Sequence, residues 1–115
     1  MEQVKIIDHP MYQLLRDEKV KEFNALKHKG EPIPSFELCD FRGLDLRGLD
    51  AKGLNLGGAY FRGADLRGID FREAQLEGAS IAATKISGCY FPTGLQPDEI
   101  IMSMTHGTRM RYRTS

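Results

Sequence analysis

Read in groups of five, residues 34–93 are PSFEL CDFRG LDLRG LDAKG LNLGG AYFRG ADLRG IDFRE AQLEG ASIAA TKISG CYFPT. The third position is apolar in all twelve units, and the fifth position holds eight of the twelve glycines in the chain. A period of five matches neither the 3.6 residues of a helical turn nor the two-residue repeat of a flat strand. The chain is therefore predicted to turn at regular steps around a narrow apolar core, with glycine at the corners.

Three of these units, LDLRG at 44–48, LNLGG at 54–58 and ADLRG at 64–68, resemble the A(D/N)LxX unit of pentapeptide repeat proteins. The resemblance spans 60 of the 115 residues and suggests a short bacterial member with a cap at each end. It implies an all-β solenoid, a right-handed quadrilateral β-helix with four units per coil and about three coils. Residues twenty apart would then stack at roughly 4.8 Å, which places Phe41 under Phe61 and Ile81.

The flanking segments are predicted to cover the two ends of the solenoid, because its end coils would otherwise expose unpaired edges. We expect one domain, with an N-terminal helical cap at 1–33, the repeats at 34–93, and a C-terminal helix and Arg-rich tail at 94–115. Asp8 is the predicted N-cap of one helix or two shorter ones that finish before Gly30. A short helix is predicted to open at Pro97 and to stop at Gly107.

Composition and motifs favour a cytoplasmic protein without an enzymatic role. Sixteen basic residues balance sixteen acidic ones, and no apolar run approaches the length of a membrane span. We therefore expect no membrane partner, and we favour a monomer. Cys39 and Cys89 are predicted to be unpaired core thiols, and the three histidines lack metal or triad spacing. No cofactor or metal is expected, and only a cleft between the N-terminal helices and the first coil could host catalysis.

The fourth position of six units is basic, and each of these residues except Arg62 follows an Asp by two positions. We expect these charges to alternate along the columns and to form a solvated structural face. The alternative is a partner surface built on Arg42, Tyr60 and Arg62, where an aromatic ring replaces the Asp.

The tail also has two interpretations. Arg109, Arg111 and Arg113 would stand about 6.7 Å apart on one side of an extended segment, which suits phosphates, and Tyr112 could stack on a base. Alternatively, Met110 and Tyr112 cover the last coil while the arginines pair with surface carboxylates.

The leading functional hypothesis is a protein-interaction or scaffold module that docks an unidentified protein through its caps and tail. The alternative is RNA or DNA binding through the tail. The resemblance also raises DNA mimicry directed at DNA gyrase, but the repeats carry seven basic residues against eight acidic ones and lack a dense negative face.

Overall fold

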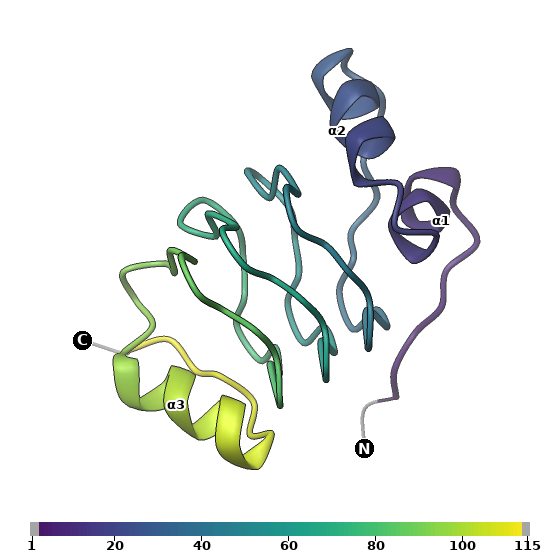
Figure 1. Cartoon of the computed structure of the whole chain (residues 1–115). Helices are drawn as coiled ribbons and strands as arrows, with labels where there is room; N and C mark the ends of the chain where they lie inside the picture. Colours follow the sequence, from purple (N-terminus) through teal and green to yellow (C-terminus); the bar gives the residue numbers. More distant parts are fainter. Residues whose placement is uncertain (1–2, 114–115) are drawn as a thin grey trace.

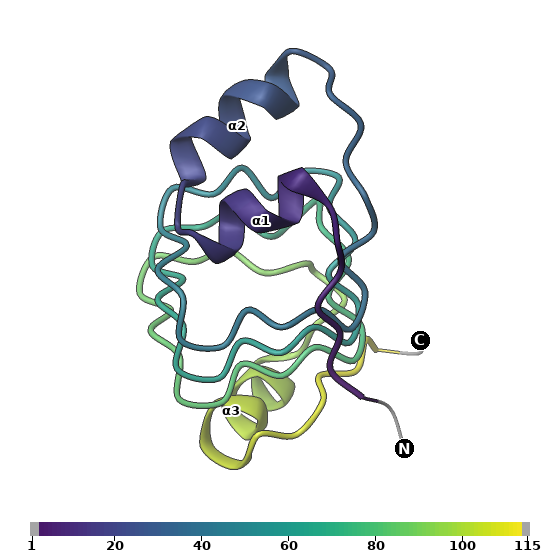
Figure 2. The same ribbon diagram turned by 90° about the vertical axis from the view of Figure 1, so that its right-hand side faces the viewer.

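A computed structural model describes residues 3–113 of the chain. The chain forms α1 (Pro10–Arg16) and α2 (Val20–His28), winds through a stack of coils, and ends with α3 (Pro97–His106) and an extended tail. Figure 1 shows α1 and α2 at one end of the stack and α3 at the other. Figure 2 shows that α1 lies across the opening of the first coil. The helices thus flank the repeats as expected.

Parallel bridges between residues twenty apart define the coil. Asp40 bridges Tyr60, Tyr60 bridges Ser80, and Asp45 bridges Asp65. Twenty residues are four units of five, so four units complete one coil, as the resemblance implied. Within residues 3–113 these contacts are isolated bridges, and the chain forms no β-strand longer than one residue. This differs from the all-β expectation. The reason is that the chain bends at each fifth position, where residues such as Gly63 have a φ of 72° that favours glycine.

The third position of the repeat forms the core. Its residues are buried from Phe36 through Ile81 and half-buried at Ile86 and Phe91 in the last coil. Phe41 stacks on Phe61 with ring centroids 5.3 Å apart, which confirms the predicted column. The coils are therefore held together by apolar side chains as well as by backbone hydrogen bonds.

The N-terminal segment supplies hydrogen-bond partners that a preceding coil would otherwise supply. The Lys5 amide donates to the Leu38 carbonyl at 2.7 Å, and the Asp40 amide donates to the Lys5 carbonyl at 2.9 Å. The Asp50 amide, two corners further on, donates to Asn24 Oδ1 at 2.9 Å. The sequence pattern places residue 5 in a helical cap and gives no sign that this segment pairs with the edge of the first coil.

The helical caps largely match their predictions. The N-terminal cap contains two helices, one of the two arrangements expected. Its first helix is capped by His9, whose Nδ1 accepts a hydrogen bond from the Met11 amide at 3.1 Å, and the prediction of Asp8 is wrong. At the other end, α3 begins at Pro97 and stops at Gly107, whose φ is 71°.

The C-terminal cover closes only part of the last coil. The Ile81 amide donates to Ser103 Oγ at 2.9 Å, and the Gly78 amide donates to the Met110 carbonyl at 2.7 Å. One face further along the coil, the amides of Ile86 and Gly88 have no hydrogen-bond acceptor within residues 3–113. The last coil therefore keeps one open edge, and its half-buried Ile86 lies there.

Candidate functional site

Most of the outward charges are neutralised inside their own repeat unit. Asp65 accepts hydrogen bonds from Arg67 Nε at 2.9 Å and Nη2 at 2.7 Å, because residues two apart lie on the same side of an extended chain. This hydrogen-bonded guanidinium lowers the pKa of Asp65 to about 2. The same pairing joins Asp40 to Arg42, Asp45 to Arg47, and Asp70 to Arg72.

The prediction that charges alternate along the columns is wrong. Asp45 bridges Asp65, so like charges are stacked there, and Asp65 bridges Lys85 only in the following coil. Opposite charges meet chiefly within a unit, and one contact crosses between coils, from Arg47 Nε to Asp65 at 3.4 Å. The arginines of these pairs are exposed to solvent, as predicted, and each one pairs with the Asp of its own unit.

The unit at 59–63 differs because Tyr60 stands where the five other units with a basic fourth residue have Asp. The Arg62 side chain makes no ion pair or hydrogen bond with any residue from 3 to 113, as its sequence context suggested. Tyr60 instead faces the tail, and its hydroxyl accepts a hydrogen bond from Arg109 Nη2 at 2.6 Å. The Arg109 guanidinium also lies 5.3 Å from the centre of the Tyr60 ring, a cation–π contact.

These residues surround a small cavity of about 260 Å³, which we call the basic hollow. It joins two sets of candidates that sequence analysis kept apart, Arg42, Tyr60 and Arg62 from the coil and Arg109 from the tail. Its remaining lining residues are Ser80 and Gly107.

Gly107 and Ser80 fix the end of α3 against the coil beside the basic hollow. The Ser80 hydroxyl donates to the Gly107 carbonyl at 3.2 Å. Gly107 has a φ of 71°, which favours glycine, and a Cβ there would lie at ordinary contact distance, 3.4 Å, from Arg62 Nη2. Sequence analysis identified Gly107 only as a helix stop and did not single out Ser80.

The basic hollow carries more positive than negative charge. Asp40 is buried, and its bidentate bond with Arg42 lowers its pKa to about 2 in spite of burial. The same carboxylate contacts Arg16 at 3.4 Å, so one anion serves two cations. Arg62 and Arg109 add two more. Glu37 and Glu77 line the neighbouring depression, which Arg109 also borders.

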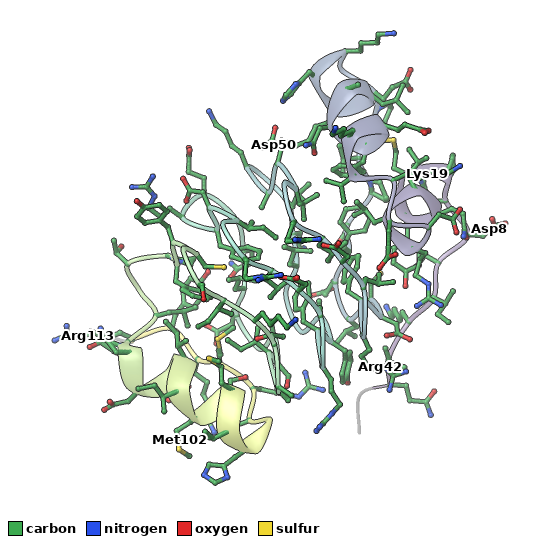
Figure 3. The ribbon with its side chains drawn as sticks, viewed as in Figure 1. Asp8, Lys19, Arg42, Asp50, Met102 and Arg113 are labelled. Carbon is green, nitrogen blue, oxygen red and sulfur yellow. The ribbon has the colours of Figure 1, made fainter. Side chains whose placement is uncertain are left out.

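The tail divides into packed and exposed residues. Met110 is buried, and the half-buried Tyr112 accepts a hydrogen bond from the Leu76 amide at 3.0 Å, as the packing alternative predicted. Arg111 and Arg113 are exposed and form no ion pair with the described part of the chain, so that half of the alternative is not observed. Figure 3 shows Arg113 projecting from the C-terminal end, far from Arg42. The structure therefore brings only Arg109 of the tail into the basic hollow.

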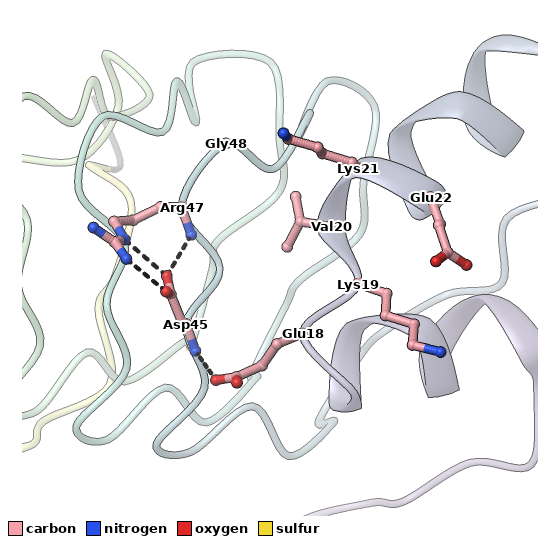
Figure 4. A pocket seen from close by; sticks show the side chains of 8 residues that line it. All are labelled: Glu18, Lys19, Val20, Lys21, Glu22, Asp45, Arg47 and Gly48. Carbon is pink, nitrogen blue, oxygen red and sulfur yellow. Dashed lines mark hydrogen bonds and ion pairs between the residues drawn. The ribbon is translucent and has the colours of Figure 1, made fainter.

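A groove of about 610 Å³ lies between the α1–α2 turn and the unit at 44–48 (Figure 4). This is the cleft where sequence analysis located the only room for catalysis. Its Glu18 carboxylate accepts the Asp45 amide at 2.5 Å, and Asp45 is itself held by Arg47 at 2.8 and 2.9 Å. Arg47 lowers the pKa of Asp45, so this carboxyl is kept ionised and already has its partners. The groove thus serves as a joint between cap and coil.

The remaining candidate groups are accounted for by packing. Both cysteines are free, and burial raises the pKa of Cys39 to about 11. Residues 3–113 contain no cluster of three His, Cys, Asp or Glu side chains suited to a metal ion. They also contain no helix with the length and apolar character needed to cross a membrane.

Comparison with known proteins identifies the repeats. The family model described as pentapeptide repeats matches residues 55–91 in eight copies. No curated protein and no solved structure gives a significant match. The matched segment contains both the paired unit at 64–68 and the exceptional unit at 59–63. Residues 55–91 therefore consist of pentapeptide repeats, which supports the resemblance found in the sequence.

Proposed function

We propose that this chain is a non-enzymatic protein-interaction or scaffold module. The observation that carries the proposal is the filling of its interior, where third-position side chains stack on one another, as Phe41 does on Phe61 at 5.3 Å. Binding groups are therefore available on the outside of the coil. Pentapeptide repeat proteins commonly act in protein interactions or as scaffolds, which supports the same function.

The repeats further support a right-handed quadrilateral β-helix as the scaffold. Bridges twenty residues apart give four units per coil, which is the geometry of that fold. Stacked coils hold their outward side chains in fixed positions, so a partner that docks on them loses little conformational entropy from this chain. Rigid presentation suits a docking role.

Affinity capture from a bacterial lysate, with and without nuclease, tests the proposal. The full chain is compared with a face variant, Arg42→Ala with Arg62→Ala, and with a tail variant in which Arg109, Arg111 and Arg113 become Ala. We expect a protein that survives nuclease treatment and is lost with at least one variant that still melts like the wild type. Capture of nothing above a blank resin would overturn the proposal.

The exposed Arg111 and Arg113 favour one second candidate, binding of RNA or DNA through the tail. Such binding would weaken steeply with salt, because it releases counterions from the phosphates. Capture that nuclease abolishes, and that the tail variant alone removes, would support it. The DNA-mimic hypothesis has less support, since the aspartates of the paired faces are neutralised by arginines such as Arg67 and Arg72.

A further inference from the structure

We propose that the basic hollow is a docking site for an acidic segment of a partner protein, with a carboxylate of the partner bound between Arg62 and Arg109. This inference rests on the proposed interaction function and names the partner's chemistry. It concerns a surface that the chain builds from one face of the stacked coils, which carries Arg42, Arg62 and Ser80, and from the residues that follow α3.

Charge complementarity is the first step. The guanidinium groups of Arg42, Arg62 and Arg109 line the hollow, and none of its described lining residues is acidic. The carboxylate of Asp40 pairs with Arg42 and Arg16. An arginine fork binds a carboxylate with two parallel hydrogen bonds, and Arg62 makes no such bond within residues 3–113. A partner carboxylate would therefore supply to Arg62 what Asp65 supplies to Arg67.

Preorganisation is the second step. Arg42 donates two hydrogen bonds to the Asp40 carboxylate, of 2.9 and 3.0 Å. Arg109 is held by Tyr60 at 2.6 Å and by the Gly78 carbonyl at 3.2 Å. Because these cations are fixed before binding, a ligand orders few additional side chains. The half-exposed Tyr60 adds an aromatic surface of the kind enriched at protein interfaces.

The compact shape favours a protein carboxylate over a nucleic acid. A phosphate backbone presents charges in a row, whereas these cations surround a cavity of about 260 Å³. Arg111 and Arg113, which would extend the row, do not line it. Glu37 and Glu77 border the depression beyond Arg109 and would repel a continuing run of phosphates.

The test titrates the ¹⁵N-labelled full chain with an acetylated, amidated hexaglutamate peptide at low salt. We expect the amide signals of Arg62, Ser80 and Gly107 to shift in a saturable manner. Arg62→Glu is expected to weaken the affinity at least tenfold. The matched control is Arg67→Glu, which makes the same change of net charge in the adjacent unit and is expected to alter the affinity less than twofold.

Tyr60→Asp is a second variant that keeps the proposal testable if Arg62→Glu disturbs the fold. It gives Arg62 an internal carboxylate, in the manner of Asp65 and Arg67, and is expected to weaken peptide binding at least tenfold while the chain keeps a cooperative melt. Equal weakening by Arg67→Glu and Arg62→Glu would show general charge attraction and would overturn the site. Absence of shifts at millimolar peptide would also overturn it.

A parallel titration with a uridine dodecamer separates the two macromolecules. Tighter binding of the RNA than of the peptide, with the same sensitivity to Arg62→Glu, would overturn the acidic protein partner. Lysate capture distinguishes the failures. A partner retained by Arg62→Glu would leave the interaction function standing and remove this surface, whereas capture of nothing would remove the function itself.

Discussion

Two neighbouring repeat units, AYFRG at 59–63 and ADLRG at 64–68, bury side chains at the same positions and differ in the side chains that face outward. In the second unit Asp65 holds Arg67 through bonds of 2.9 and 2.7 Å. In the first, Tyr60 leaves Arg62 unpaired within residues 3–113 and receives Arg109 from the tail. The identity of one outward residue, Asp or Tyr, therefore decides whether the arginine of the unit is paired within that unit.

In both units the role of a residue depends on its position in the repeat. The first, third and fifth residues form the coil, and both units bury their first and third residues equally. In these two units the second and fourth residues lie outward and determine what the surface presents. Substitutions inside the coil should therefore have large effects on stability, whereas outward ones should act on pairing and binding.

The largest effect is expected where the two units are the same. Phe61→Asp and Leu66→Asp each place a charge without a partner at a position that is at most 1% exposed. Each is expected to cost more than about 4 kcal/mol and to abolish the cooperative melt followed by circular dichroism. A melt like that of the wild type in either variant would show that the third position does not face the core.

A smaller effect is expected from the ion pair between the buried Asp40 and the half-exposed Arg42, which lines the basic hollow. The pKa of Asp40 is lowered to about 2 in the folded chain, from an ordinary value near 3.8, chiefly by its hydrogen bond with Arg42. The stability that this carboxylate contributes is therefore complete above the ordinary value and is lost as the pH falls through about 2.

Melting curves between pH 6 and pH 2 check this prediction. Asp40→Asn is expected to be less stable than the wild type at pH 6, and the gap should narrow as the pH falls. Tyr60→Asn serves as the control, because it removes no carboxylate and should retain the pH profile of the wild type. A gap that is constant across the range would contradict the assigned role of Asp40.

A still smaller effect is expected from the contact that joins the charged face to the tail. Tyr60→Phe removes the acceptor of the 2.6 Å hydrogen bond from Arg109, and we expect a loss of about 1 kcal/mol. The tail should loosen only locally, with faster hydrogen exchange at the amides of Gly78 and Met110. The Gly78 amide donates to the Met110 carbonyl at 2.7 Å, and the Met110 amide donates to the Ala79 carbonyl at 2.9 Å. Unchanged exchange at both amides would mean that Tyr60 does not anchor the tail.

The smallest effect is expected from the outward arginines themselves. Arg62→Ala and Arg67→Ala should both melt like the wild type, because exposed ion pairs contribute little. The two variants should differ only in binding of the acidic peptide, which Arg62→Ala weakens and Arg67→Ala leaves intact. A marked fall in melting temperature for Arg67→Ala would show that the paired faces stabilise the coil more than this comparison allows.

The candidate site was only partly predictable from the sequence. The isolated Arg62 could be recognised by counting from each arginine to the Asp two residues earlier. That Arg109 would meet Tyr60, 49 residues away, could not be recognised, since it depends on how α3 returns the chain across the last coil. Lys5 and Asn24 were missed for the same reason, because their partners are backbone groups of a coil edge that the sequence does not mark.

The five-residue period, the buried positions, the glycine turns and the helices at each end could all be recognised in the sequence. These features repeat every five residues or arise within a single helix, so local pattern is sufficient. The tertiary structure alone decided which groups close the coil edges, that the amides of Ile86 and Gly88 stay without acceptors in the described chain, and that coil and tail arginines share one hollow. Such contacts join residues far apart in sequence, and their geometry follows from the path of the whole chain.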